Sequence, residues 1–292
     1  MKLRAYAKIN LGLDVLRRRE DGYHEVRMIM QTIRMYDRLE IKKTDDPGIH
    51  LRTNLDYIPV NEDNLVYKAA KLLMDQYQIK QGVTIDLRKF IPVAAGMAGG
   101  SSDAAATLVG INKIFRLGLS VEELMELGVQ IGADVPYCIM RGTALAEGIG
   151  EKLTALSPMP ECHVLIGKPG ISVSTKYVYT NLRLDENTDH PDIDGMLEAI
   201  NKGELTGITQ RMKNVLEPGV VEGHPVIAEI EKLMKEHGAL NAVMSGSGPT
   251  VFGLFDDKSK AEEALQALKG SGLARNTFLT TVFNNGGTGN DK

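Results

Sequence analysis

The chain has 292 residues, of which 43% are hydrophobic and 25% charged, and its formal net charge is −4. This composition is typical of a globular protein with one large domain or, as we expect, two modest ones. The acidic balance argues against a nucleic-acid-binding surface, because such surfaces are usually basic. The start of the chain resembles no signal peptide, and no apolar run reaches membrane-spanning length, so we expect a cytoplasmic protein with no membrane partner.

The cysteines and histidines follow no metal-binding pattern. Cys138 and Cys162 lie far apart and match no metal or redox spacing, so we expect two buried free thiols. The six histidines include neither HxxxH nor HExxH, which argues against a structural transition-metal site.

The first part of the chain predicts strands followed by a helix. Residues 3–15 alternate loosely between apolar and polar and predict a strand that contains Lys8 and Asn10. The turn Asp21-Gly22 leads into a second predicted strand, VRMIMQTI, and LEIKK predicts a further, separate one. DNLVYKAAKLLMDQY has the apolar spacing of a helix, with Asp63 or Asn64 near its start.

The stretch PVAAGMAGGSSDAAA, from Pro92 to Ala106, is rich in glycine. It follows a predicted strand, VTIDLRKF, and leads into a predicted helix, for which Ser101, Ser102 and Asp103 offer N-cap chemistry. Strand, glycine-rich turn and helix N-terminus form an arrangement suited to binding an anion such as phosphate. The alternative is a tight turn whose glycines only permit close packing. The sequence contains no P-loop, no GxGxxG and no HRD or DFG motif of protein-kinase type, so a nucleotide would bind by another route.

Two features follow this stretch. Ser120 and Glu123 form a capping-box pattern at the start of a helix that we expect Gly132 to end. Asp134 comes next, two residues before Pro136, and taken alone it is typical of a turn residue.

The segment SPMPE, residues 157–161, is the best candidate for a domain boundary. Beyond it we expect a strand HVLIGKP, a short helix capped by Ser174 or Thr175, and largely helical residues 191–237. Two strands around SGSGPT, a helix and a last strand complete the pattern, which predicts an α+β sandwich with antiparallel pairing. We therefore expect domains at 1–156 and 157–283 and a disordered tail at 284–292.

Three separated segments, AKINLGL, PVAAGMAGGSSDAAA and MSGSGPTVFG, together resemble the three motifs of the GHMP small-molecule kinases. The resemblance covers nearly the whole chain, and three motifs in order are far more specific than one. It implies an α+β, two-domain GHMP kinase fold. The N-terminal domain would resemble domain 2 of ribosomal protein S5, and the C-terminal domain would be a ferredoxin-like α/β sandwich.

The resemblance also implies roles for individual residues. The glycine loop would wrap the phosphates of ATP, with Mg²⁺ bridging them and Asp103 a candidate neighbour of the ion. Asp134 would be the general base that faces the acceptor hydroxyl, across a cleft shared with the triphosphate, and Lys8 would be the cation beside it. Met97 departs from the family, which often has leucine there. The loop residues are Pro92, Val93, Ala94, Ala95, Gly96, Met97, Ala98, Gly99, Gly100, Ser101, Ser102 and Asp103.

Within the family, the segments DGYHE, EDNL, GADVPYCIMRGTALAEGIGE and KPGISVSTKYVY resemble a kinase of the non-mevalonate isoprenoid pathway. Its acceptor is a small molecule that carries a cytidine diphosphate group and receives phosphate on its 2-hydroxyl. Mevalonate, phosphomevalonate or homoserine as acceptor is an alternative, and so is a nucleotide-binding regulator without catalysis. We expect a monomer or homodimer. The substrate would be held by Asn10, Tyr23, His24, Thr175 and Tyr179.

Overall fold

The structure is a computed structural model, and it describes residues 1–284. The chain forms two compact units, each assembled from several segments. Unit 1 comprises Met1–Ala7, Met35–Val93 and Ala98–Met140, and unit 2 comprises Lys8–Arg34, Ala94–Met97 and the chain from Arg141 onward. The domain boundary predicted after residue 156 stays a prediction. The predicted disordered tail lies, from residue 285 on, outside the described residues.

Two long strands, β1 (Lys2–Arg18) and β2 (His24–Thr44), contribute residues to both units. The separate strand predicted at LEIKK is wrong, because these residues are the last part of β2. No glycine or proline interrupts the chain between Val26 and Thr44, and the end of β2 is held by antiparallel pairing with β4 (Gly82–Arg88).

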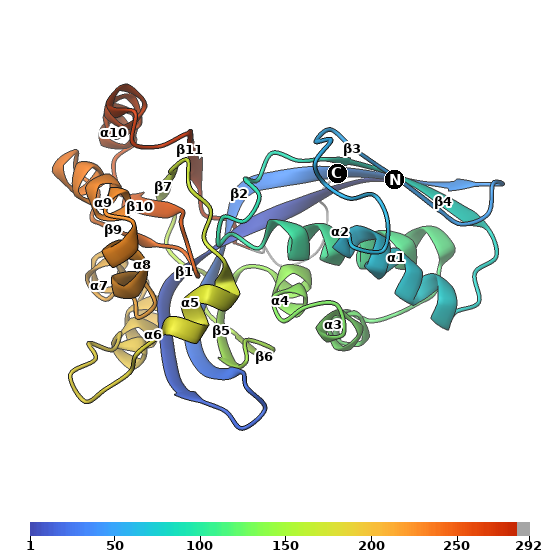
Figure 1. Cartoon of the computed structure of the whole chain (residues 1–292), viewed down its shortest axis with the longest axis horizontal. Coiled ribbons are helices and arrows are strands. Elements are labelled where there is room, and N and C mark those ends of the chain that lie inside the picture. The colour runs from blue at the N-terminus through green and yellow to red at the C-terminus, as the bar shows by residue number, and fades with distance from the viewer. Residues whose placement is uncertain (285–292) are drawn as a thin grey trace. The chain divides into compact units, whose positions relative to one another are not determined.

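In unit 1, helices pack on strands in the order β3-β4-β2-β1. Ile41 of β2 lies opposite Ile85 of β4, which in turn lies beside Leu51 of the parallel strand β3. Helices α1 and α2 lie together on one face of these strands (Figure 1). A Cβ at Gly110 of α2 would lie 2.6 Å from side-chain atoms of Ile41 and Leu3, so this helix packs closely on the strands. The remaining elements of the unit are β3 (Ile49–Thr53), α1 (Leu65–Gln76), α2 (Gly99–Phe115), α3 (Val121–Val129) and α4 (Val135–Met140).

In unit 2, the later part of the chain forms an antiparallel sheet in the order β11-β7-β10-β9. Helices α9 and α10 pack on this sheet. A Cβ at Gly167 would lie 2.9 Å from Leu268 of α10 and 3.0 Å from Ile230 of α9. The predicted antiparallel α+β sandwich is confirmed. Its elements are β7 (His163–Lys168), α9 (Val226–Glu236), β9 (Asn241–Met244), β10 (Val251–Phe255), α10 (Lys258–Ser271) and β11 (Asn276–Thr281).

The rest of unit 2 surrounds its parts of β1 and β2. β5 (Thr143–Gly148) pairs with β2 and with β6 (Lys152–Ala155), while the two-residue strand β8 (Lys213–Asn214) runs parallel to β1. The largely helical stretch predicted at 191–237 is confirmed except at β8. It contains α6 (Ile193–Lys202), α7 (Leu205–Gln210) and α8 (Glu217–Gly223), and it follows α5 (Thr175–Asn181).

Cys138 and Cys162 are both buried thiols, as predicted, and burial raises the pKa of Cys162 to about 12. Among residues 1–284, no helix is both long and apolar enough to cross a membrane.

Candidate active site

The glycine loop lies in the connection between β4, which ends at Arg88, and helix α2, which begins at Gly99. Gly96 has φ +70° and Ala98 has φ +54°, in the left-handed region, so the helix begins at Gly99. The predicted N-cap role of Ser101, Ser102 and Asp103 is wrong, because these residues lie inside the helix. Ser102 Oγ donates to Tyr6 O at 2.6 Å, and Asp103 pairs with Lys89. The N-cap residue, Ala98, has no side chain that could accept a hydrogen bond from the first turn of α2. The N–H groups of this turn also lack acceptors within the helix, so they are suited to binding an anion.

Unit 2 brings parts of all three motif segments together. The amide of Lys8 donates to Met97 O at 3.2 Å, and Ser245 Oγ donates to Gly96 O at 3.0 Å. A Cβ at Gly96 would lie 2.1 Å from Ser245 O, and a Cβ at Gly246 would lie 3.4 Å from Asn10 Oδ1. Segments about 90 and 150 residues away in the sequence therefore meet the tip of the glycine loop.

Lys8 and Asn10 are buried on β1. Lys8 is 4% exposed, and its Nζ donates to Asn10 Oδ1 at 2.7 Å. Asn10 in turn donates through Nδ2 to Met28 Sδ at 3.2 Å. A lysine in a strand is usually solvated, so the burial of this ammonium group beside the glycine loop rules out an ordinary surface side chain.

The loop between β9 and β10 is held by two side chains, the buried Asn214 and the partly buried Glu217. Asn214 Nδ2 donates to Met244 O and Gly246 O at 2.8 and 2.7 Å. Glu217 accepts the Met244 amide at 2.7 Å and interacts with the nearby carboxyl group of Glu231. Burial and the Glu217 carboxylate raise the pKa of Glu231 to about 8. Glu231 therefore holds a proton at neutral pH.

The raised pKa of Glu231 predicts that the stability of the protein depends on pH. Between the unfolded pKa of 4.5 and the folded value of about 8, the folded state holds a proton on Glu231 that the unfolded state has released. The free energy of unfolding should therefore fall as pH rises through this window, by about 1.4 kcal/mol per pH unit from this group. Urea denaturation at a series of pH values should show that Glu231→Gln removes this contribution.

A matched control is Glu236→Gln, at an exposed residue of the same helix that pairs with Lys232. It should keep the wild-type dependence on pH. The same pH profile for Glu231→Gln and wild type would contradict the assignment.

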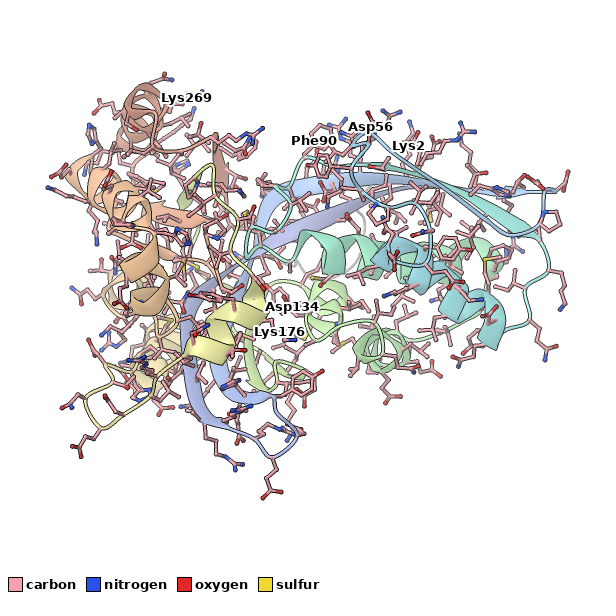
Figure 2. The ribbon with its side chains drawn as sticks, in the orientation of Figure 1. Lys2, Asp56, Phe90, Asp134, Lys176 and Lys269 are labelled. Carbon is pink, nitrogen blue, oxygen red and sulfur yellow. The ribbon has the colours of Figure 1, made fainter. Side chains whose placement is uncertain are left out.

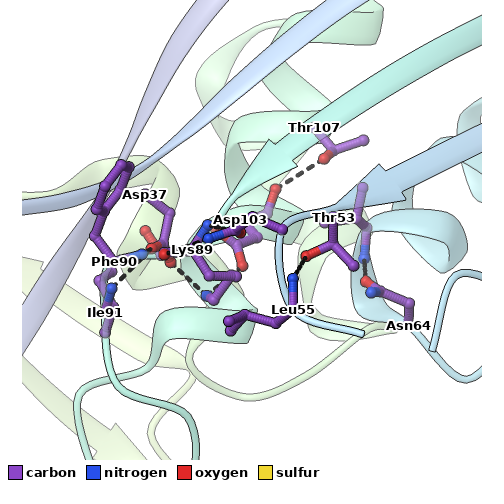
Figure 3. Close-up of polar contacts among 12 residues, drawn as sticks. Asp37, Thr53, Leu55, Asn64, Lys89, Phe90, Ile91, Asp103 and Thr107 are labelled. Carbon is purple, nitrogen blue, oxygen red and sulfur yellow. Dashed lines mark hydrogen bonds and ion pairs between the residues drawn. The ribbon is translucent and has the colours of Figure 1, made fainter. Parts of the chain in front are cut away.

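In unit 1, Lys89 lies between two buried carboxylates (Figure 3). Its Nζ contacts Asp37 Oδ2 and also Asp103 Oδ2, the latter at 2.6 Å. Burial lowers the pKa of Lys89, but the carboxylates of Asp103 and Asp37 outweigh this and raise it. Burial raises the pKa of Asp103 well above its usual range although Lys89 opposes this, and the Asp37 carboxylate adds to the rise. Asp103 is therefore engaged with Lys89, and its predicted place beside Mg²⁺ stays a prediction.

No group of three or more His, Cys, Asp or Glu residues within positions 1–284 is arranged to hold a metal ion. Such a group is not required for a nucleotide-bound Mg²⁺, which is commonly held by phosphates, water and one or two protein ligands.

Asp134 lies immediately before α4 in unit 1, where Figure 2 labels it. Its carbonyl accepts the amide of Cys138 at 3.1 Å, so it opens the first turn of this helix. Capping-box residues Ser120 and Glu123 begin the preceding helix α3, as predicted. The expectation that the Asp134 carboxylate faces the acceptor hydroxyl across a cleft shared with the triphosphate, with Lys8 beside it, stays a prediction.

Among the predicted substrate residues, His24 and Tyr179 form an aromatic pair, and Thr175 is hydrogen-bonded to the loop that follows β9. The rings of His24 and Tyr179 lie 5.2 Å apart between centroids, and Tyr23, directly before β2, is 61% exposed. Partial burial and the nearby Arg18 cation lower the pKa of His24, which favours a neutral ring. Thr175, at the start of α5, shares a hydrogen bond of 2.7 Å with Ser247.

Sequence reasoning missed Asp37, Lys89 and Asn214. Each is buried and polar, but none lies in a recognisable motif. Lys89 lies three residues before Pro92, where the glycine loop begins, and a lysine at the end of an otherwise half-buried strand is the one available signal.

Comparison with known proteins places two family domains on the chain. Residues 64–142 match the family described as GHMP kinases N terminal domain, and residues 196–273 match GHMP kinases C terminal. A 4-diphosphocytidyl-2-C-methyl-D-erythritol kinase of Lachnoclostridium phytofermentans is 58% identical over 283 residues, which cover 97% of each chain. The enzyme of the same name from Lachnospira eligens is 56% identical and covers 97% of this chain and 98% of its own.

Among solved structures, a crystal structure of 4-(cytidine 5'-diphospho)-2C-methyl-D-erythritol kinase superposes with a TM-score of 0.83 at 33% identity. The match covers 97% of this chain and 99% of that structure.

Proposed function

The chain belongs to the GHMP kinase family, and from this membership we propose that it transfers phosphate from ATP to the 2-hydroxyl of 4-diphosphocytidyl-2-C-methyl-D-erythritol. The predicted family resemblance and the predicted ATP-dependent kinase activity are confirmed. The observation that carries the choice of acceptor is the 58% identity to a kinase of that name over nearly the whole chain. The product would be the 2-phosphate, with ADP as co-product, on the non-mevalonate route to isoprenoid precursors.

We assign the triphosphate to the glycine loop, Pro92 to Asp103. Phosphoryl transfer depends mainly on positioning and on stabilisation of charge. Amides of the first turn of α2 would supply that stabilisation, and its N-terminus adds the favourable end of the helix dipole. Mg²⁺ belongs to this proposal as the partner of the phosphates, where it would offset their charge when bound.

Asp134 is the proposed general base, and Lys8 is the proposed cation beside it. A carboxylate is a weak base toward an alcohol, but it can orient the hydroxyl and accept its proton late, when transfer is nearly complete. A neighbouring ammonium would keep the carboxylate ionised and would stabilise the developing alkoxide. The burial of Lys8 beside Met97 and Asn10 supports its part of this assignment.

The cytosine ring is assigned to Tyr23, His24 and Tyr179, with Asn10 and Thr175 positioning the rest of the acceptor. The ring contact between His24 and Tyr179 supports a flat aromatic ligand at this place. A neutral His24 can both donate and accept hydrogen bonds at the edge of a pyrimidine. A cytoplasmic location and a monomeric or homodimeric state complete the proposal and rest on sequence expectations alone.

Competition by CDP tests the acceptor. CDP should raise the apparent KM for the cytidine-bearing acceptor without changing kcat, because both would occupy the same aromatic site. Tyr179→Ala should weaken CDP binding roughly 5- to 150-fold, the equivalent of about 1–3 kcal/mol of stacking. Calorimetric titration of CDP gives the affinity.

Tyr177→Ala is the matched control, since this tyrosine lies on the same helix and is 64% exposed. It should bind CDP as the wild type does. Absence of competition by CDP, together with turnover of mevalonate, phosphomevalonate or homoserine, would favour a smaller acceptor. Absence of ADP release with every acceptor would favour a nucleotide-binding regulator.

A further inference from the structure

The ion-pair triad of Asp37, Lys89 and Asp103 joins the two stems of the glycine loop (Figure 3). The entry stem is held by Asp37, whose Oδ1 accepts the amide of Ile91 at 2.8 Å and also that of Phe90. These amides directly precede Pro92, where the loop begins. On the exit side, Asp103 lies in the second turn of α2 and binds Lys89 Nζ. One ammonium group therefore connects the residues on both sides of the loop.

The packing around the triad is tight. Asp37 is fully buried, and Lys89 and Asp103 are 8% and 2% exposed. A Cβ at Gly99 would lie 3.2 Å from Lys89 Nζ and 3.1 Å from Ile91 Cγ2, so the first residue of α2 lies directly against this group. Asp103 Oδ1 has no hydrogen-bond partner in the described part of the chain, which leaves Lys89 as the main contact of that carboxyl group.

We propose that Lys89 and Asp37 are positioning residues that fix the first turn of α2 relative to the end of β4, and thereby set the amides that bind the triphosphate. The proposal rests on the assignment of ATP to the glycine loop. Neither residue touches the nucleotide in this account. Their effect on binding comes from the separation and orientation of the two stems.

The competing explanation is charge compensation alone, in which Lys89 only neutralises two buried acids. Removing one partner of a buried ion pair leaves an uncompensated charge and destabilises the fold. A loss of activity in Lys89→Met would therefore fit both explanations. The test needs variants that cut the connection without leaving an excess of buried charge.

Asp37→Asn is the first such variant. Asparagine keeps a side-chain oxygen for the amides of Phe90 and Ile91 but removes the charge that holds Lys89, which stays paired with Asp103. We expect the KM for ATP to rise about tenfold with kcat changed less than about twofold, because binding rather than chemistry is affected. In the full chain without nucleotide, amide hydrogen exchange at Gly99–Asp103 should accelerate by about tenfold. Asp86→Asn is the control. Asp86 forms an exposed ion pair with Arg88, also on β4, and its replacement should change neither the KM for ATP nor the hydrogen exchange.

The second variant that cuts the connection is the double substitution Lys89→Met/Asp103→Asn. It removes Lys89 together with one of the two buried carboxyl groups that Lys89→Met would leave behind, so its Tm should recover relative to Lys89→Met while its KM for ATP stays raised. Recovery of both quantities would overturn the proposal, and so would a folded Asp37→Asn with wild-type KM and exchange. If the wild type binds no ATP, the proposed nucleotide site fails, whereas the exchange measurement still tests the connection between the stems.

Discussion

Replacing Asp134 by asparagine should lower kcat by about 10²–10⁴-fold, the range associated with loss of a general acid–base group. Asparagine has nearly the same shape but cannot accept the proton of the acceptor hydroxyl. Because the residue opens α4 through its backbone carbonyl, the fold should survive the substitution. Steady-state ADP release at saturating substrates measures the effect, and the KM for ATP should change little.

A suitable control for this variant is Asp75→Asn in the same unit, where an exposed carboxylate pairs with Lys71 on α1. It should keep wild-type kinetics. Near wild-type turnover of a purified, folded Asp134→Asn protein would show that another group orients the hydroxyl and takes its proton.

Gly96→Ala should lower kcat/KM by about 10²-fold or more, because displacement of reacting groups by about 1 Å can cost that much. The new Cβ would lie 2.1 Å from Ser245 O at a residue with φ +70°, so either the glycine loop or the loop after β9 must move. Both loops carry residues assigned to the site. When the ATP concentration is varied, most of the loss should appear in kcat/KM for ATP.

Gly118→Ala is the matched control for backbone strain. Gly118 has a similar φ of +76°, but a Cβ there would meet no atom within 4 Å. This variant should lose about 1–2 kcal/mol of stability from the left-handed conformation and keep wild-type kinetics. Equal kinetic behaviour of the two variants would contradict the close approach of the two loops.

Local sequence patterns predict much of this fold because the forces that they describe are local. The strand, glycine turn and helix around Gly96, the capping box of Ser120 and Glu123, and the helix start at Asn64 all depend on residues within a few positions of each other. The helix start at Gly99 was missed because the left-handed Ala98 has no sequence signature comparable to that of glycine.

The buried side chains that hold the loops of the site could not be predicted in the same way. Lys89 binds a carboxylate 52 residues earlier in the chain, and Asn214 holds carbonyl groups 30 and 32 residues later. Such pairings depend on which strands become neighbours, and no short pattern records this. A single buried lysine or asparagine also resembles an ordinary surface residue until its burial is known.

The most direct test of the proposed activity is ADP release across a panel of acceptors, with ³¹P NMR of the product. We expect turnover with 4-diphosphocytidyl-2-C-methyl-D-erythritol, a new phosphomonoester signal on its 2-oxygen, and no turnover with mevalonate, phosphomevalonate or homoserine. Turnover of one of these smaller acceptors in place of the cytidine-bearing one, or ADP formation without a new phosphomonoester, would contradict the account.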